Sequence, residues 1–237
     1  MRVASITMER KTSLKAKLIL RLPLGLIVFA AILFIPAGTL KFWQGWAYMA
    51  CFFIPLLFSF AYLYKHDPQL LERRMQVKEK VREQKPFQLL APLIFFSSFL
   101  LTGLDHRFGW SRTSLRPVPL WLTLLSQALV VSGILLILWV MKVNSFASRT
   151  IQVEAGQTVI SSGPYRFVRH PMYFGGLVLY LPTPLALGSF IALPAFALFI
   201  PLLVFRLLNE EKVLRRELPG YPEYCLRTRF RLLPFVW

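Results

Sequence analysis

The dominant pattern in this sequence is a series of long apolar runs separated by basic segments. Four runs lie at residues 22–38, 46–64, 87–104 and 118–141. Each approaches or exceeds the roughly 18 consecutive apolar residues that a helix needs to cross the hydrocarbon core of a bilayer. The pattern therefore predicts four membrane-spanning helices in the first part of the chain.

A fifth apolar region, residues 173–208, is too long to be a single span. Its 36 residues would form a helix of roughly 54 Å, whereas the hydrocarbon core is roughly 30 Å thick. Gly188 lies between its halves and tolerates the backbone geometry of a tight turn, so we expect the chain to fold back there. Pro182 and Pro184 could bend or end the first half early. The predicted fold is an all-α integral membrane protein with about six membrane helices, the last two a helical hairpin.

Composition supports a bilayer as the solvent. Apolar residues make up 56% of the chain and charged residues only 16%, against roughly 25% charged residues in soluble domains. A net charge of +17 could indicate a nucleic-acid partner, but the basic residues lie between apolar runs and form no RNA-binding motif. We therefore expect membrane lipid, and no nucleic acid, as a partner.

The distribution of Lys and Arg predicts an orientation. Of the 28 such residues, 4 fall in other segments and 24 fall in residues 1–21, 65–86, 142–173 and 206–237. Because positive charge is retained on the cytoplasmic side, we expect both termini and these basic segments to be cytoplasmic. Residues 1–17 then read as an uncleaved cytosolic leader, and residues 65–85 as a solvated loop, helical or irregular, at the anionic lipid surface.

The two cysteines indicate neither a disulfide framework nor a metal site. Cys51 and Cys225 form no CxxC pair or Cys/His cluster, so we expect them to pack and to bind no metal. Most of the unusual polar chemistry follows the fourth apolar run. We therefore divide the chain into four N-terminal spans, residues 1–141, and a catalytic region, residues 142–237.

A turn-rich segment followed by a basic motif opens the last apolar region. Arg169, His170 and Pro171 lie directly before it, and proline suits the first helical position because no amide donor is lost there. His170 would then lie at the helix cap, beside free amides and the positive end of the helix dipole, where an anionic or acceptor group can bind. Alternatively, Arg169 and His170 only anchor the helix at the lipid headgroups.

A second polar group follows the same region. Arg206 and Glu210 are four residues apart, on one helical face, and Glu211 is adjacent. The predicted turn returns this group to the side of Arg169 and His170. Two carboxylates at the foot of a membrane helix are costly to desolvate, so we expect a cationic partner, although a solvated helix end with an Arg206–Glu210 pair is the alternative.

The order of these motifs resembles the isoprenylcysteine carboxyl methyltransferase and phospholipid methyltransferase superfamily over roughly residues 142–237. The resemblance is carried by Gly163-Pro164-Tyr165, Arg169-His170-Pro171-x-Tyr173, Glu210-Glu211, Gly220-x3-Tyr224 and a terminal Leu233-Pro234. Several motifs in one order are more specific than a single short motif.

The resemblance implies S-adenosylmethionine as the cofactor and assigns the site residues. Residues that would line the cofactor pocket are Gln157, Thr158, Val159, Ile160, Tyr165, His170, Pro171, Met172 and Tyr173. Glu210 or Glu211 would hold the cofactor's ammonium group, Arg206 would face the acceptor, and Arg169 and His170 complete the catalytic set. Many family members carry His where Gln157 stands, and glutamine cannot titrate.

The expected reaction is methyl transfer to a lipophilic small-molecule or prenylated acceptor, without a metal. A carboxylate acceptor is ionised at neutral pH and requires no general base. A phospholipid amine would have to lose a proton, with help from a carboxylate or His170. A nicotinamide-dependent sterol-type reductase is a third possibility, because such enzymes share the Gly-Pro-Tyr and Arg-His-Pro motifs. The non-enzymatic alternative is a membrane scaffold or transporter. The oligomeric state and the acceptor stay open.

Overall fold

The chain is built from helices throughout the part that the structure describes. The computed structural model describes the backbone of residues 2–75, 85–147, 152–154 and 156–237, with side chains from residue 19 onward. The helices are α1 (Arg2–Ala37), α2 (Trp43–His66), α3 (Pro68–Met75), α4 (Lys85–Phe108), α5 (Trp110–Ser114), α6 (Leu120–Val143), η2 (Gly163–Arg166), α7 (Pro171–Tyr180), α8 (Thr183–Ala186), α9 (Leu193–Ala197), α10 (Phe199–Glu217) and α11 (Tyr221–Arg227). The predicted all-α class is confirmed for these residues.

Five helical stretches have the length and composition of a membrane span within the described residues. They are Ile19–Ala37, Trp43–His66, Lys85–Phe108, Leu120–Val143 and Leu193–Glu217. The first four overlap the four apolar runs of the N-terminal region. The basic segment after α2 is partly helical, as α3, and its residues 76–84 lie outside the described part of the chain.

The predicted count of six membrane helices is not confirmed, because the fifth segment is broken. Helix α7 has 10 residues, roughly 15 Å of helix, which is half of a hydrocarbon core. Pro182 and Pro184 follow it, and α8 adds only four residues. Proline supplies no amide for a helical hydrogen bond, which is why α7 ends where it does. The chain then turns at Gly188, whose φ is +76°, as the sequence predicted.

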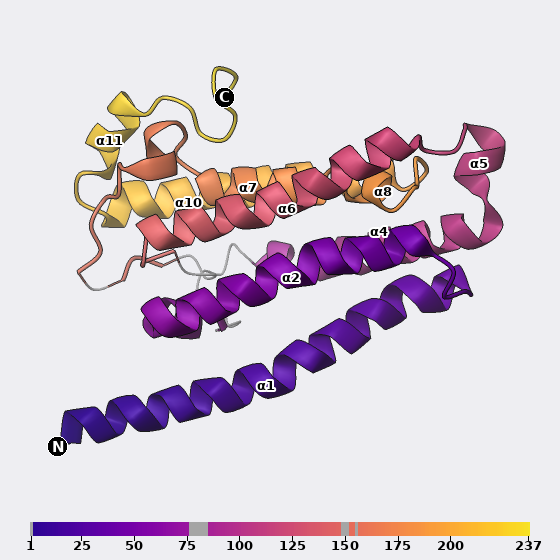
Figure 1. Ribbon diagram of the computed structural model, residues 1–237. Coiled ribbons are helices and arrows are strands. Elements are labelled where there is room, and N and C mark those ends of the chain that lie inside the picture. The colour runs from indigo at the N-terminus through magenta and orange to yellow at the C-terminus, as the bar shows by residue number, and fades with distance from the viewer. Residues whose placement is uncertain (1, 76–84, 148–151, 155) are drawn as a thin grey trace.

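A buried carboxylate fixes this turn at the end of the molecule that carries α5 and α8 (Figure 1). Asp105 of α4 accepts a hydrogen bond from the Ser111 amide (2.7 Å) and others from the Ser111 and Ser189 hydroxyls. The Ser111 oxygen in turn accepts from the amides of Phe190 and Ile191 at 2.9 and 3.1 Å. The turn is therefore held against α4 and α5, and α10 returns along α7 toward the opposite end.

Helix α7 is positioned by close contact with α6, and the two lie side by side in Figure 1. Gly133 of α6 faces the α7 backbone: a Cβ placed there would lie 2.6 Å from the Leu179 nitrogen and 2.8 Å from the Gly175 oxygen. Only glycine permits this approach. Since α7 begins with the Arg169-His170-Pro171 motif, the contact between α6 and α7 also sets the position of that motif.

We predict that Gly133→Ala lowers the free energy of unfolding by about 1–3 kcal/mol, because the added methyl group meets backbone atoms that cannot move aside. Gly176→Ala is the matched control, because a Cβ at Gly176 meets nothing within 4 Å. The measurement is thermal unfolding of both purified variants in one detergent. Equal midpoints would show that the two helices do not pack at Gly133.

Candidate functional site

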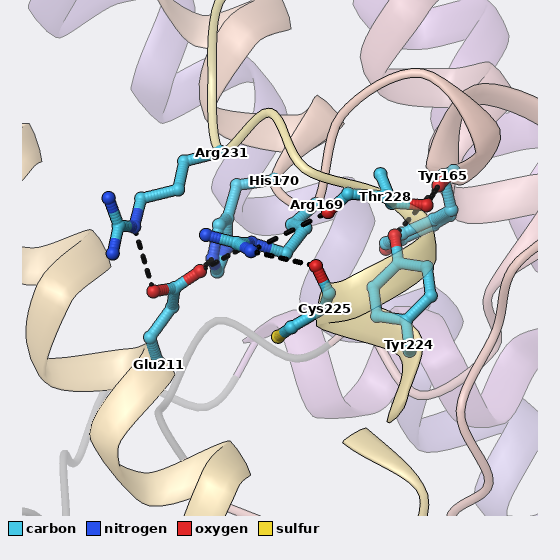
Figure 2. Close-up of polar contacts among 8 residues, drawn as sticks. All are labelled: Tyr165, Arg169, His170, Glu211, Tyr224, Cys225, Thr228 and Arg231. Carbon is cyan, nitrogen blue, oxygen red and sulfur yellow. Dashed lines mark hydrogen bonds and ion pairs between the residues drawn. The ribbon is translucent and has the colours of Figure 1, made fainter. Parts of the chain in front are cut away.

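A buried carboxylate lies at the centre of the polar cluster in Figure 2. Glu211 of α10 is 4% exposed. Its Oε1 lies 2.7 Å from Arg169 Nε, and its Oε2 lies 2.9 Å from Arg231 Nε. His170 Nε2 is 3.5 Å from the same Oε1. The cluster thus joins α10, the segment before α7 and the C-terminal tail, and it supplies cationic partners for Glu211, one of the two carboxylates for which the sequence predicted them.

Backbone pairing explains why Arg169 and Arg231 reach the same carboxylate. The amides of Arg169 and His170 donate to the carbonyls of Phe230 and Arg231, each at 2.9 Å. The tail therefore lies alongside the segment that leads into α7. Pro171 is the first residue of α7 and His170 is its N-cap, which confirms the helix start predicted from the sequence.

Tyr165 of η2 takes part in a neighbouring set of hydrogen bonds. Its hydroxyl accepts a hydrogen bond from Asn144 Nδ2 at 2.8 Å, and its carbonyl accepts one from the Tyr224 hydroxyl at 2.7 Å. Burial raises the pKa of Tyr165 to about 12, with the Asn144 hydrogen bond opposing the rise, the nearby Glu210 carboxylate adding to it and Arg74 opposing it. The hydroxyl is therefore neutral at physiological pH and lies near groups of both charges.

Glu210, the second carboxylate of the pair, faces a different set of partners. It accepts a hydrogen bond from the hydroxyl of Tyr173 on α7. Arg206, one helical turn earlier on α10, also interacts with Tyr173. The Arg206 side chain is buried, with 7% of the residue exposed, and its guanidinium carbon lies 4.5 Å from the ring centre of Phe87 on α4. A cation and an anion thus adjoin one tyrosine hydroxyl.

The residues of the predicted cofactor pocket that precede η2 differ in their contacts and in their exposure. Val159 packs in one apolar cluster with Tyr165 and Tyr221. Gln157 instead accepts a hydrogen bond from the Glu154 amide at 2.9 Å, a local contact that stabilises its own turn. Thr158 is exposed, whereas Ile160 is half-buried.

Met172 occupies another side of α7 from Tyr173. It packs toward α2, α3 and α6, and its sulfur lies 3.1 Å from Arg74 Nη1. Adjacent helical residues point about 100° apart, so Met172 and Tyr173 cannot share one face.

Sequence reasoning missed several residues that the fold brings to this region: Phe87, Arg74, Asn144, Tyr221 and Arg231. Tyr221 lies inside the Gly-x3-Tyr motif, and Arg231 lies in the alternating arginines of the tail, so both carried a signal. Phe87 begins an apolar run, and Arg74 and Asn144 lie in segments between runs, so none of the three belongs to a motif. Only long-range packing identifies them.

Comparison with known proteins gives the family of this region. Residues 121–219 match the family model for phospholipid methyltransferase. This confirms the resemblance to the superfamily that the motif order indicated, over a region that contains α7 and α10, and it supports a membrane methyltransferase. The tail residue Arg231 lies outside the match.

Part of the chain is also similar to a protein of a different named activity, a sterol reductase. The chain is 35% identical over 91 residues to the Delta(14)-sterol reductase TM7SF2 of Mus musculus. The similarity covers 37% of this chain and 22% of that reductase. The chain therefore spans about a fifth of the length of this relative.

The described residues fit the cofactor that the family implies. S-adenosylmethionine presents an ammonium, a sulfonium, a carboxylate and an adenosine. The Tyr221 side chain is 4% exposed, and its hydroxyl has no hydrogen-bond partner among the described residues. Burial raises the pKa of Tyr221, and the carboxylates of Glu211 and Glu210 add to the rise. A buried hydroxyl without a partner among the described residues, whose oxygen can accept a hydrogen bond, suits a polar, cationic ligand when it lies near two carboxylates.

We predict that Glu211→Gln and Glu210→Gln differ in their effect on stability. Glu211→Gln leaves two guanidinium groups without a counter-charge, so the free energy of unfolding should fall by about 3 kcal/mol. Glu210→Gln keeps an acceptor for Tyr173 and should unfold near the wild-type temperature. Thermal unfolding in detergent, without ligand, compares the two. Equal stability would contradict the organising role of Glu211.

Proposed function

We propose that this chain is an S-adenosylmethionine-dependent membrane methyltransferase that acts on a lipophilic carboxylate, isoprenylcysteine-like in chemistry. The observation that carries the proposal is the placement of Arg206 and Glu210 on one face of α10, both at the Tyr173 hydroxyl. A carboxylate there suits a cationic cofactor and a guanidinium suits an anionic acceptor. The phospholipid methyltransferase match of the surrounding region supports this assignment.

Glu210 is the residue that would hold the cofactor's ammonium group. Both oxygens of Glu211 already face arginines, so its charge is offset within the protein. Glu210 is half-buried, and an anion in that setting pairs readily with a cation. Tyr165, His170, Pro171, Met172, Tyr173 and the stretch Gln157–Ile160 would line the remainder of the pocket. Bound there, S-adenosylmethionine would supply a methyl group on a positively charged sulfur that leaves as a neutral thioether.

Arg206 would orient the acceptor. A planar guanidinium binds both oxygens of a carboxylate at once and so fixes its direction of attack. The acceptor is ionised at neutral pH and needs no base, which leaves orientation as the main contribution of the protein to the rate. The contact with Phe87 places the arginine between α10 and α4, and both belong to membrane-spanning stretches. Access from the lipid suits an acceptor with an apolar tail.

The charge distribution supports a cytoplasmic site. The ends of α2, α6 and α10 that surround the polar clusters lie at the end of the molecule away from α5 (Figure 1). The segments rich in Lys and Arg adjoin the same helix ends. By the positive-inside rule that end faces the cytoplasm, where soluble S-adenosylmethionine is available.

Two other acceptors or reactions have support of their own. The match to the phospholipid methyltransferase family favours a phospholipid acceptor. For an amine of that kind, Glu210 or His170 would have to take the proton. The similarity to the sterol reductase favours a nicotinamide-dependent reduction. Opposing this, a carboxylate pair suits an ammonium better than the phosphates of a dinucleotide.

Methyl transfer to a membrane lipid fraction tests the proposal directly. Purified protein is incubated with S-adenosylmethionine labelled in the methyl group and with a total membrane lipid extract. We expect a labelled lipid that releases the label as methanol under mild base, because an ester is the product. A labelled product that is stable to base would reject the carboxylate acceptor, and no labelled product with folded protein would reject methyl transfer to these lipids.

We predict that Arg206→Lys lowers turnover by about tenfold or more at saturating cofactor, because lysine keeps the charge but loses the planar fork. Cofactor affinity should stay near that of the wild type. With an amine acceptor, by contrast, Arg206→Lys should have little effect. A positive charge at this position opposes a protonated amine, and lysine carries the same charge as arginine. Full activity in Arg206→Ala would exclude the carboxylate-orienting role.

A further inference from the structure

A cation from the N-terminal region lies against the first turn of α7. Arg74 lies in the last turn of α3, in the basic segment that follows α2. Its Nη1 donates to the Ala147 carbonyl at 3.2 Å and lies 3.1 Å from the Met172 sulfur. The guanidinium is therefore held against the loop after α6 and against the first turn of α7.

Arg74 and Glu210 approach the same side chain from different helices. The Tyr165 hydroxyl lies within electrostatic reach of both groups, and it is itself held by Asn144 at 2.8 Å. Glu210 accepts a hydrogen bond from the Tyr173 hydroxyl. A positive and a negative group thus adjoin the buried Tyr165, one from α3 and one from α10.

We propose that Arg74 binds the α-carboxylate of the cofactor while Glu210 binds its α-ammonium, so that the two residues together recognise a free amino-acid group. This inference rests on the proposed function. The ammonium and carboxylate of S-adenosylmethionine are attached to one carbon, and a ligand with both charges is matched by a pair of opposite charges around one pocket. Arg74 lies outside the family match of residues 121–219, so the match assigns it no role.

The charge balance of the pocket supports this division. Glu211 is paired with Arg169 and Arg231, and Arg206, which the proposed function assigns to the acceptor, interacts with Tyr173 and Phe87. Arg74 is the cation that the structure places against Met172, two residues after the α7 N-cap. A guanidinium is the side chain that best matches a carboxylate, because its donors form a planar fork.

Arg73 offers a matched control on the same helix. Its Nη1 donates to the Ser145 carbonyl at 2.9 Å, and its guanidinium lies 5.7 Å from the Phe146 ring centre. It therefore has the same charge and a similar contact with the same loop, but it has no contact with Met172 or Tyr165 among those that the described residues show. A loss caused only by loosening the loop should appear in both arginine variants.

The experiment is calorimetric titration of purified full-length protein with S-adenosylhomocysteine and with its decarboxylated analogue, which keeps the amine and the adenosine. The proteins are wild type, Arg74→Met, Arg74→Lys and Arg73→Met. We expect the wild type to prefer S-adenosylhomocysteine by about 10- to 100-fold, the worth of a charge-assisted hydrogen bond. Arg74→Met should bind the two ligands equally, Arg74→Lys should keep part of the preference, and Arg73→Met should keep all of it.

Titration results other than these would overturn either the role of Arg74 or the proposed function. Equal binding of both ligands by the wild type would overturn the inference whatever the variants do. An unchanged preference in Arg74→Met, with a raised KM for the lipid acceptor, would mean that the carboxylate bound by Arg74 belongs to the acceptor, and would also overturn it. Equal weakening of both ligands in Arg74→Met would reduce Arg74 to a structural contact. If the folded wild type binds neither ligand, the proposed function fails, and not only the role of Arg74.

Discussion

The buried ion cluster of Glu211 is the constraint on which the candidate site depends. Removing a carboxylate from water costs several kcal/mol, which close cations and hydrogen bonds offset. Arg169 and Arg231 supply them at 2.7 and 2.9 Å, and they come from segments far apart in sequence. One carboxylate therefore fixes three elements relative to each other: α10, the start of α7 and the C-terminal tail. Glu210, Tyr173 and His170 lie on or beside these elements, so the cluster contributes to their relative placement.

This constraint also separates the roles of two adjacent glutamates. Because neighbouring helical residues point about 100° apart, Glu211 faces the tail while Glu210 faces Tyr173 and Tyr165. The first carboxylate is balanced within the protein. The second lies beside the pocket, with Arg206 one turn away on the same face, so a single helix can present an anion to the cofactor and a cation to the acceptor. The proposed chemistry uses positioned charges and requires no buried base.

Local signals in the sequence predicted the local structure well. Pro171 marked the start of α7 and Gly188 marked the turn before α9, because each residue has a strong backbone preference of its own. The count of membrane helices was less predictable, since apolar composition does not show that Pro182 ends α7 after ten residues. The partners of Glu211 and the approach of Arg74 to Met172 depend on packing between distant segments, which no single-sequence pattern encodes. The cost of burying a carboxylate predicted that a cation would lie near it. The sequence did not show that Arg169 and Arg231 would be the cations beside Glu211.

The polar groups around Glu210 are proposed to bind S-adenosylmethionine and not a nicotinamide dinucleotide. Calorimetric titration of the purified wild-type protein with S-adenosylhomocysteine and, separately, with NADPH distinguishes the two most directly. S-adenosylhomocysteine shares every group of the cofactor except the transferred methyl, so the account predicts binding at micromolar or lower concentration, and no measurable binding of NADPH. Binding of NADPH by folded protein that does not bind S-adenosylhomocysteine would contradict the account and favour a reductase.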